Sequence, residues 1–401
     1  MNTRTARSRW TALALTGALA GSLALGVGAP AFAAAPAASP AATGASTALP
    51  PLDPAAIRAV LAARPGDVVS GAFVRVTGKA GHFTGTSGDV NPDGEFRIGS
   101  ISKVFSAAVA LQLAAEGTLD LNGTVQHYLP GVLPADYPPI TVGELLNHTS
   151  GLPGGTVGWG DPSTNWFADH RFDSWTPEQI VGGLAGQPMG FQPGTAQQYN
   201  GMNTFLEGLV IEKVTGDSYA HQVQQRIIRP LGLHHTSVPE ADDPRLPHPD
   251  AHPYLNITEP DGSTGRADVT EQSPWPWAEG GLISSSGDLD RLFTALFGGK
   301  LLPPAQQALL FTVPDVPNFN SSHCETGPGS RACMSMGLES IVLHGVTLWG
   351  KTGSRPGWTS GVFATRDLSR TLVYSVNPTG INGEETPYMM KLATTAAGLS
   401  N

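Results

Sequence analysis

Strand-like segments at both ends of the chain, with helices between them, limit the possible folds more than any other feature. Alternating apolar residues predict a hairpin over residues 68–86, and strands over 340–348, 359–365 and 371–376. A chain of 401 residues is long enough to bury a sizeable core. Strands from both ends bury their apolar faces together when they share a sheet. The sequence therefore predicts an α/β (α+β) fold, with an antiparallel sheet flanked by helices.

Helical patterns occupy the middle of the chain. Apolar residues run almost without a break over 101–116, and helical periodicity returns over 202–214 and 282–297. This order predicts two domains: a sheet domain of residues 51–118 and 278–401, and an inserted, mainly helical domain of residues 119–277.

The first 33 residues have the three parts of a secretory signal peptide. Three arginines precede an apolar run over residues 10–27, and Ala31-Phe32-Ala33 supplies small residues for cleavage. Glycines interrupt the run, which makes a membrane anchor the weaker alternative. Residues 34–50 are uncharged and rich in Ala and Pro, which predicts a disordered linker. We therefore expect a secreted protein with no membrane attachment after residues 1–33 are removed.

Charge and cysteine usage narrow the expected partners. The net charge is −10 at pH 7 and becomes more negative without the arginines of the signal, which argues against nucleic acid and anionic membranes. The two cysteines, Cys324 and Cys333, close a short loop rich in Gly and Pro, and in an exported protein we expect them to form a disulfide. No histidine lies in an HExxH pattern, so we expect no metal site.

Ser100-Ile101-Ser102-Lys103 stands at the start of the long apolar helix. Residues three apart lie on one helix face, so Lys103 is expected to face Ser100. A helix N-terminus presents free N–H groups and partial positive charge, which favour an oxyanion formed beside Ser100. Burial lowers the pKa of a lysine, and a neutral Lys103 can take the proton of Ser100. By itself, a helix-capping serine beside an ordinary lysine explains this segment equally well.

Two later segments hold groups that complete such a site. Lys351-Thr352-Gly353 follows a strand pattern, where the lysine brings a second positive charge near Lys103 and the glycine leaves room for a substrate backbone. Tyr199 precedes a predicted helix and is a candidate proton relay, whose pKa we expect the two lysines to lower. The alternatives are a strand that turns at its glycine and an amphipathic tyrosine at a domain interface.

In this order and at these separations, the three segments resemble those of the serine β-lactamase and penicillin-binding protein superfamily. The pattern is similar to that of class C β-lactamases and D-alanyl-D-alanine carboxypeptidases, over residues 65–400, and it includes ITVGELLNHTSGL at 140–152. The resemblance implies a β-lactamase/transpeptidase-like fold, with no metal or organic cofactor. The residues implied are Ser100, Lys103, Tyr199 and Lys351 for catalysis, and Thr352, Gly353 and the backbone amides of Ser100 and Ser354 around the oxyanion.

The chain departs from the superfamily pattern at two places that concern the substrate. Gly201 stands where an Asn usually follows the tyrosine, and Asn203 is a candidate substitute one helical turn beyond Tyr199. Residues 338–340 lack the Arg that binds a substrate carboxylate, and Arg355 is a candidate for that role. Trp358 either lines the cleft or packs beneath loops.

The resemblance implies a secreted acyl-enzyme serine hydrolase, in first place a penicillin-binding, D-Ala-D-Ala carboxypeptidase-like enzyme. Its substrate is expected to be a small peptide, ester or β-lactam, with cell-wall peptidoglycan as a further candidate, and the protein is expected to be a monomer. An esterase or β-lactamase on the same scaffold stays open, because an ester needs less activation than an amide. A non-catalytic penicillin or peptidoglycan sensor also stays open, although four intact reactive side chains count against it.

Overall fold

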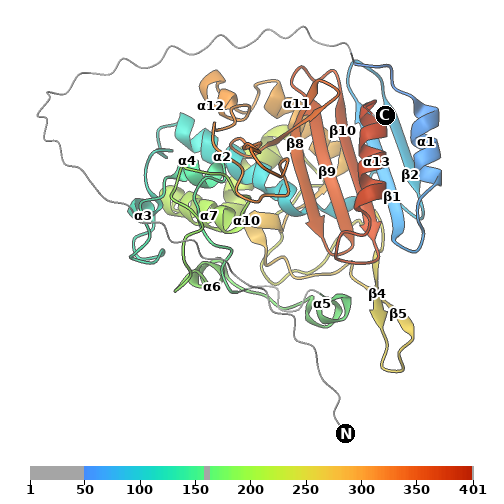
Figure 1. Ribbon diagram of the computed structural model, residues 1–401, viewed down its shortest axis with the longest axis horizontal. Helices are drawn as coiled ribbons and strands as arrows, with labels where there is room; N and C mark the ends of the chain where they lie inside the picture. Colours follow the sequence, from blue (N-terminus) through green and yellow to red (C-terminus); the bar gives the residue numbers. More distant parts are fainter. Residues whose placement is uncertain (1–48, 158–162, 400–401) are drawn as a thin grey trace, which may run out of the picture. The chain divides into compact units, whose positions relative to one another are not determined.

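A six-stranded antiparallel sheet is the central element of the structure, a computed structural model that describes residues 49–157 and 163–399. The strand order is β2-β1-β10-β9-β8-β7, so strands from both ends of the chain lie side by side (Figure 1). This arrangement confirms the predicted fold class. The predicted signal peptide and nearly all of the predicted linker lie outside the described residues. The strands of this sheet are β1 (Val69–Thr77), β2 (Phe83–Ser87), β7 (Glu339–Leu343), β8 (Val346–Arg355), β9 (Trp358–Thr365) and β10 (Thr371–Pro378).

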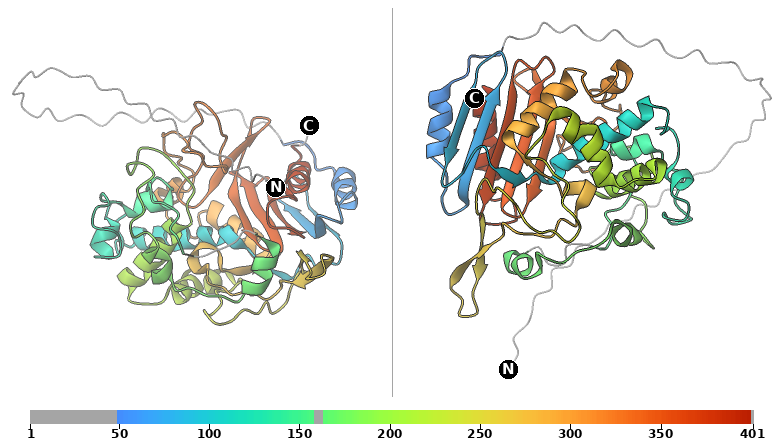
Figure 2. Two further views of the ribbon diagram at one scale, coloured as in Figure 1. Left: turned by 60° about the horizontal axis from the view of Figure 1, so that its bottom comes forward. Right: turned by 180° about the vertical axis from the view of Figure 1, so that it is seen from behind.

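Helices cover both faces of the sheet (Figure 2). On one face, α1 and α13 pack against an apolar cluster that includes Val74, Leu372 and Tyr374. On the other face, α2 and α11 pack against Phe73 and Val362. The described helices are α1 (Pro54–Ala62), η1 (Gly99–Ile101), α2 (Ser102–Ala115), α3 (Val125–Tyr128), α4 (Val142–Leu146), α5 (Thr164–His170), α6 (Pro177–Gly182), α7 (Met202–Thr215), α8 (Tyr219–Val223), η2 (Gln224–Ile228), α9 (Arg229–Leu231), α10 (Trp277–Gly280), α11 (Ser286–Phe297), α12 (Pro304–Leu309) and α13 (Thr386–Ala397).

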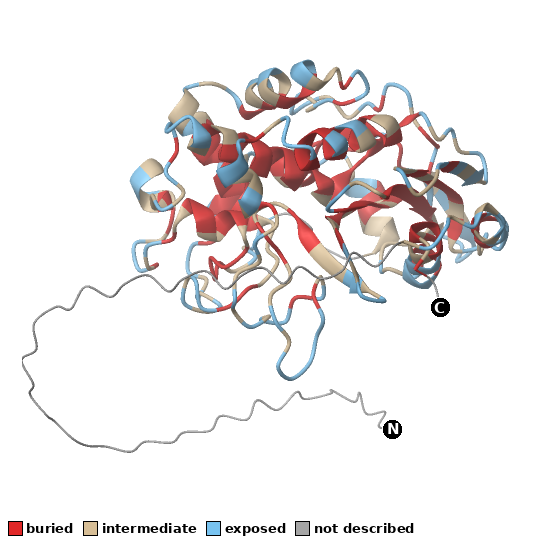
Figure 3. Cartoon of the chain, turned by 90° about the horizontal axis from the view of Figure 1, so that it is seen from above, coloured by how far each residue is buried: buried red, intermediate tan, exposed pale blue. Residues whose placement is uncertain are grey.

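Helix α2 lies in the protein interior, because it is apolar on nearly every side. Most of its residues are buried, including Val104, Phe105 and Leu111, and buried positions dominate the central helices and the sheet (Figure 3). Packing from all sides fixes both the axis and the rotation of α2. The side chains at its N-terminus are therefore held in one place relative to the sheet.

Two predicted elements differ from the structure. Residues 282–297 were expected to form one helix, but Ile283–Ser285 form strand β6, which pairs with β3 (Glu95–Arg97). Helix α11 begins only after Ser285, whose hydroxyl accepts the backbone N–H of Asp288. Residues 340–348 were expected to form one strand, but they belong to β7 and β8. The chain turns between these strands at His344 and Gly345, which both have positive φ.

The segment between residues 119 and 277 is mainly helical, as expected, but it also contains a two-stranded hairpin. The hairpin consists of β4 (Tyr254–Thr258) and β5 (Thr264–Asp268). The division into a sheet domain and an inserted helical domain stays a prediction. No helix within the described residues is long and apolar enough to span a bilayer.

Candidate active site

Two glycines hold the segment before α2 against strand β8. Gly99 has φ +50°, and a Cβ built on it would lie 2.5 Å from both the backbone N and O of Ser354. A Cβ on Gly353 would collide with the carbonyl oxygen of Ile98. Only glycine at these two positions lets the backbone of residues 98–99 approach the backbone of residues 353–354 so closely. Ser100 is therefore held beside the strand that carries Lys351–Ser354.

The hydroxyl of Ser100 receives hydrogen bonds from two of the predicted catalytic residues. Nζ of Lys103 lies 3.1 Å from Oγ of Ser100, across the first turn of the helix. The phenol of Tyr199 comes from the loop before α7 and donates to the same oxygen at 2.6 Å. Tyr199, which is 99 residues from Ser100 in the sequence, thus shares one hydrogen-bond network with Ser100 and Lys103, which is the geometry that an activated nucleophile needs.

Lys351 joins this group from strand β8. Its Nζ lies 4.8 Å from the ring centroid of Tyr199, and Nζ of Lys103 lies 5.0 Å from the same centroid. The ring of Tyr199 therefore lies within reach of two amines. The structure brings all four predicted catalytic side chains together.

Each lysine has a carboxylate partner that the sequence analysis did not identify. Nζ of Lys103 lies 2.5 Å from Oε1 of Glu279, and it also donates to the Glu279 backbone carbonyl at 2.7 Å. Nζ of Lys351 lies 3.1 Å from Oε2 of Glu339, and both of these side chains are only 3% exposed. Lys351 was expected to lower the pKa of Lys103 further, but the lowering in the structure comes from burial, and Lys351 is paired with Glu339.

The pKa shifts follow from burial more than from charge. Burial lowers the pKa of Lys103, as expected, and the carboxylate of Glu279 opposes part of this shift. The expected lowering of the Tyr199 pKa was wrong, because burial raises the pKa of this phenol more strongly than Lys351 lowers it. Tyr199 therefore stays a neutral phenol near pH 7 and donates its proton to Ser100. Burial would raise the pKa of Glu339, but Lys351 and then His323 hold it at about 2.

Two histidines flank the ring of Tyr199. The ring centroid of His148 lies 4.9 Å from that of Tyr199, and the centroid of His323, the residue before the disulfide loop 324–333, lies 4.1 Å away. Burial, followed by the charges of Lys103 and Lys351, lowers the pKa of His148 well below its usual value. His148 is therefore neutral at physiological pH. His148 lies inside the matched segment 140–152, which was its only sequence signal.

Asn203 does not occupy the place proposed for it. Its side chain is fully buried, where Oδ1 accepts from the hydroxyl of Ser150 at 2.6 Å and Nδ2 lies 2.9 Å from Nδ1 of His148. Because these contacts occupy both ends of the amide, Asn203 supports His148 beside Tyr199. It does not take over the role of the Asn that Gly201 replaces.

Arg355 and Trp358 are both buried. The guanidinium of Arg355 is buried and donates through Nη2 to Oε1 of Gln272 at 2.9 Å, while its Nη1 has no hydrogen-bond partner among the described residues. Trp358 has no exposed surface, and its indole N–H donates to Asp250 at 3.0 Å. Arg355 lines the same cavity as Ser100, so its role in binding a substrate carboxylate stays a prediction. For Trp358, the structure selects the packing alternative.

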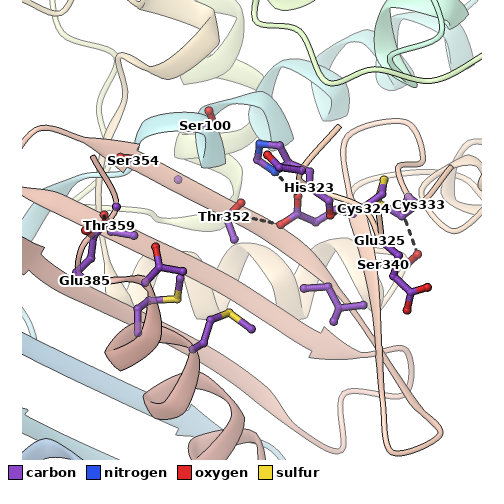
Figure 4. Close-up of a pocket in the computed structure, with 18 of the residues that line it drawn as sticks. Ser100, His323, Cys324, Glu325, Cys333, Ser340, Thr352, Ser354, Thr359 and Glu385 are labelled. Carbon is purple, nitrogen blue, oxygen red and sulfur yellow. Dashed lines mark hydrogen bonds and ion pairs between the residues drawn. A yellow bond between two sulfur atoms is a disulfide. The ribbon is translucent and has the colours of Figure 1, made fainter. Parts of the chain in front are cut away.

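The Ser100–Tyr199 hydrogen bond joins residues of two cavities. The strand cavity, of about 1110 Å³, is bounded by β7, β8, α13 and the disulfide loop. Figure 4 shows Ser100 above it, with Thr352 and Ser354 along β8 and the Cys324–Cys333 disulfide at one end. The helix cavity, of about 550 Å³, lies on the side of α7 and is lined by Tyr199, Gly201 and Glu279. Ser100 thus borders the strand cavity, and its hydrogen-bond partner Tyr199 borders the helix cavity.

Comparison with known proteins agrees with this geometry. A family model described as beta-lactamase matches residues 56–392. The chain belongs to the beta-lactamase family. It lies within the serine β-lactamase and penicillin-binding protein superfamily, as its three motifs predicted. A similar solved structure is the D-stereospecific amidohydrolase from a Streptomyces species, with 33% identity, a TM-score of 0.73, and coverage of 86% of this chain and 98% of that one.

Other relatives of this beta-lactamase family chain are more distant or match over shorter segments. The D-amino acid amidase of Ochrobactrum anthropi SV3 is 25% identical, with a TM-score of 0.66 over 85% of this chain and 98% of that one. Penicillin-binding protein 4 of Amycolatopsis lactamdurans is 33% identical, over 39% of each chain. A beta-lactamase-like protein of Arthroderma benhamiae is 26% identical, over 67% of this chain and 46% of the relative. The chain thus spans less than half the length of these two curated relatives.

Proposed function

We propose that the protein is an acyl-enzyme serine hydrolase that cleaves amides, with Ser100 as its nucleophile. The observation that carries this proposal is the pair of hydrogen bonds on Ser100 Oγ, from Tyr199 at 2.6 Å and from Lys103 at 3.1 Å. Neutral Lys103 accepts the proton of Ser100 as Oγ bonds to the acyl carbon. Tyr199 gives its proton to the leaving nitrogen when the C–N bond breaks, and Lys103 returns a proton to Tyr199. Water then cleaves the acyl ester and restores Ser100.

The backbone around Gly353 supports an oxyanion site in this mechanism. The N–H groups of Ser100 and Ser354 belong to segments that touch through Gly99. A negative oxygen that forms on the substrate beside both segments is stabilised by amides that need not move. Thr352 and Ser354 border the same cavity and provide the polar wall along which the substrate lies.

The charges in the strand cavity favour a substrate without a free carboxylate next to the scissile bond. Glu325 and Glu385 line this cavity, together with Glu339, whose charge is paired with Lys351. Of the described cationic residues that line it, Arg331 pairs with Asp315, and Arg355 is buried and donates through Nη2 to Gln272. A terminal carboxylate would meet the like charges of Glu325 and Glu385. This arrangement favours an amide hydrolase over a D-Ala-D-Ala carboxypeptidase.

We further propose that the substrate is an amide of a D-amino acid. The similar Streptomyces protein is described as a D-stereospecific amidohydrolase, and the chain covers nearly all of it. Esterase and β-lactamase activities on the same scaffold stay as alternatives, because esters and β-lactams are also acylating agents for Ser100. A sensor that forms a stable adduct is the non-catalytic alternative.

The test is a substrate panel with the purified protein and two serine variants. The substrates are D-phenylalanine amide, L-phenylalanine amide, a D-Ala-D-Ala peptide, p-nitrophenyl acetate and benzylpenicillin. We expect the fastest amide cleavage with the D-amide, and loss of all turnover in Ser100→Ala. Ser322→Ala is the matched control, because Ser322 is an exposed serine of the same cavity. Turnover of the ester alone, or a stable penicillin adduct without turnover, would support one of the alternatives.

We also propose that the protein is exported and loses residues 1–33. The Cys324–Cys333 disulfide supports an oxidising destination. N-terminal sequencing of protein from the culture medium tests this proposal. A mature chain that begins at Ala34 is the expected result, and an intact Met1 would contradict it.

A further inference from the structure

The helix cavity contains one charged side chain among apolar ones. Of the described residues that line it, Glu279 alone is charged, and the apolar wall includes Leu152, Phe205 and Trp275. A carboxylate beside such a wall matches a ligand that carries a cation next to an apolar group. Tyr199 lines the same cavity and donates to Ser100, so the wall of this cavity is one hydrogen bond away from Ser100 Oγ.

Only one oxygen of the Glu279 carboxylate has a protein partner among the described residues. Oε1 contacts Nζ of Lys103 at 2.5 Å, whereas Oε2 makes no hydrogen bond or ion pair with a described residue. The side chain is 23% exposed, in contrast to 4% for Lys103. An ionised carboxylate has acceptor capacity for several donors, so Glu279 can accept another N–H while it keeps Lys103.

The position of Glu279 relative to the nucleophile matches the covalent geometry of an amino-acid amide. Nζ of Lys103 bridges Ser100 Oγ and Glu279 Oε1. In an amino-acid amide, the α-nitrogen lies only about 2.5 Å from the carbonyl carbon that Ser100 attacks. A carboxylate one amine away from Oγ is therefore within reach of the α-nitrogen of a bound substrate.

We propose that Glu279 is the residue that binds the free α-ammonium group of the substrate, with the substrate's apolar side chain in the helix cavity. This inference rests on the proposed amide hydrolase function, and it narrows the substrate class to amides of amino acids with an unblocked α-amine. An N-acylated substrate has a neutral amide in place of the ammonium, so it gains no charge-assisted hydrogen bond from Glu279.

The same contact couples substrate binding to the nucleophile. In the free enzyme, Glu279 favours the charged form of Lys103. A substrate ammonium that shares this carboxylate brings a like charge close to Lys103 and favours the neutral amine. The substrate thus helps Lys103 to become the base that takes the proton of Ser100.

The test compares D-phenylalanine amide with N-acetyl-D-phenylalanine amide in the wild type, in Glu279→Gln and in Glu325→Gln. Glu325 is an exposed carboxylate of the strand cavity, so its variant removes the same charge from the other side of Ser100. We expect Glu279→Gln to lower kcat/KM for the free amine roughly 10- to 100-fold more than for the N-acetyl compound, because one charge-assisted hydrogen bond is lost. Glu325→Gln should leave the ratio of the two substrates unchanged.

Hydrolysis of p-nitrophenyl acetate, which has no amine, distinguishes a failure of the ammonium site from a failure of the amide hydrolase function. If the wild type cleaves both amides and Glu279→Gln lowers both equally, the amide hydrolase function stands and the ammonium site is overturned. If the wild type cleaves neither amide but the ester reaction needs Ser100, both the amide function and the ammonium site are overturned. Loss of substrate preference in Glu279→Gln, with ester hydrolysis retained, supports the ammonium site.

Discussion

Gly201 and Glu279 use the same space beside the nucleophile. A Cβ built on Gly201 would lie 2.9 Å from Oε1 of Glu279, the oxygen that contacts Lys103. A residue with a side chain at position 201 would therefore push the carboxylate away from Lys103. The glycine at position 201, where the superfamily pattern has Asn, thus leaves the space in which Glu279 contacts Lys103.

Substitution of Gly201 by alanine tests this pair. We expect Gly201→Ala to leave the melting temperature nearly unchanged, because the atoms it meets belong to the end of a flexible side chain. The kcat/KM for D-phenylalanine amide should fall about 10-fold, since a charge-assisted hydrogen bond near Lys103 is displaced. The matched control is Gly154→Ala, because Gly154 lines the same cavity with no heavy atom within 4 Å of its built Cβ. Equal losses in both variants would contradict the pairing.

The pH dependence of ester hydrolysis reports on the charge that Glu279 places beside Lys103. Lys103 must be neutral to act as a base, so the rate rises as the pH passes upward through its pKa. Glu279 raises this pKa against the effect of burial. In Glu279→Gln, the rising limb of kcat/KM for p-nitrophenyl acetate should therefore move to lower pH. A shift to higher pH, or no shift, would show that Glu279 does not set the charge state of Lys103.

The hydroxyl of Tyr199 is expected to matter for chemistry and little for the fold. Tyr199→Phe keeps the ring between Lys103 and Lys351 but removes the donor to Ser100 Oγ. We expect kcat for the amide to fall by roughly 100-fold or more, the usual range for a positioned proton donor. The kcat for p-nitrophenyl acetate should fall less, because its leaving group needs less protonation than an amide nitrogen. Comparable losses on both substrates would argue against a role in protonating the leaving nitrogen.

The buried pair of Glu339 and Lys351 is expected to stabilise the fold. Glu339→Gln leaves the ammonium of Lys351 buried without its counter-charge, which costs about 3–5 kcal/mol. Urea denaturation measures this loss. Glu116→Gln is the control, because it breaks an ion pair between Glu116 and Arg226 whose carboxylate is 49% exposed, and such pairs contribute about 1 kcal/mol or less. Similar losses in the two variants would contradict this account of the buried pair.

The same pair predicts a defined acid sensitivity. The pKa of Glu339 is about 2 in the folded protein, below its ordinary value of 4.5. Its contribution to stability is therefore complete above pH 4.5 and is lost as the pH falls from 4.5 toward 2. The wild type should lose more stability over this range than Glu339→Gln. Parallel stability curves for the two proteins would show that Glu339 is not held ionised.

The fold and the nucleophile were predictable because their signals are local or periodic. Alternating strands at both chain ends, the apolar pattern after Ser100, and the spacing of Ser100 to Lys103 each follow from neighbouring residues. Strand β6 was missed because Ile283–Ser285 is too short to show a period of its own beside helix α11. A run of only three residues can be assigned as a strand only when the strand it pairs with, here β3, is known.

The electrostatics of the site were not predictable from the sequence, because they depend on long-range contacts. Glu279 lies 176 residues from Lys103, in a four-residue helix with no motif of its own. The two lysines were expected to lower the pKa of Tyr199. Burial raises this pKa more than Lys351 lowers it, and Glu279 and Glu339 add to the increase.

The central claim is that Ser100 becomes covalently acylated, and mass spectrometry after rapid quenching tests it most directly. Protein mixed with D-phenylalanine amide or p-nitrophenyl acetate and quenched in acid should gain the mass of one acyl group. Peptide mapping should place that group on Ser100, and Ser100→Ala should show no gain. An adduct on another residue, or turnover by Ser100→Ala at the wild-type rate, would contradict the account.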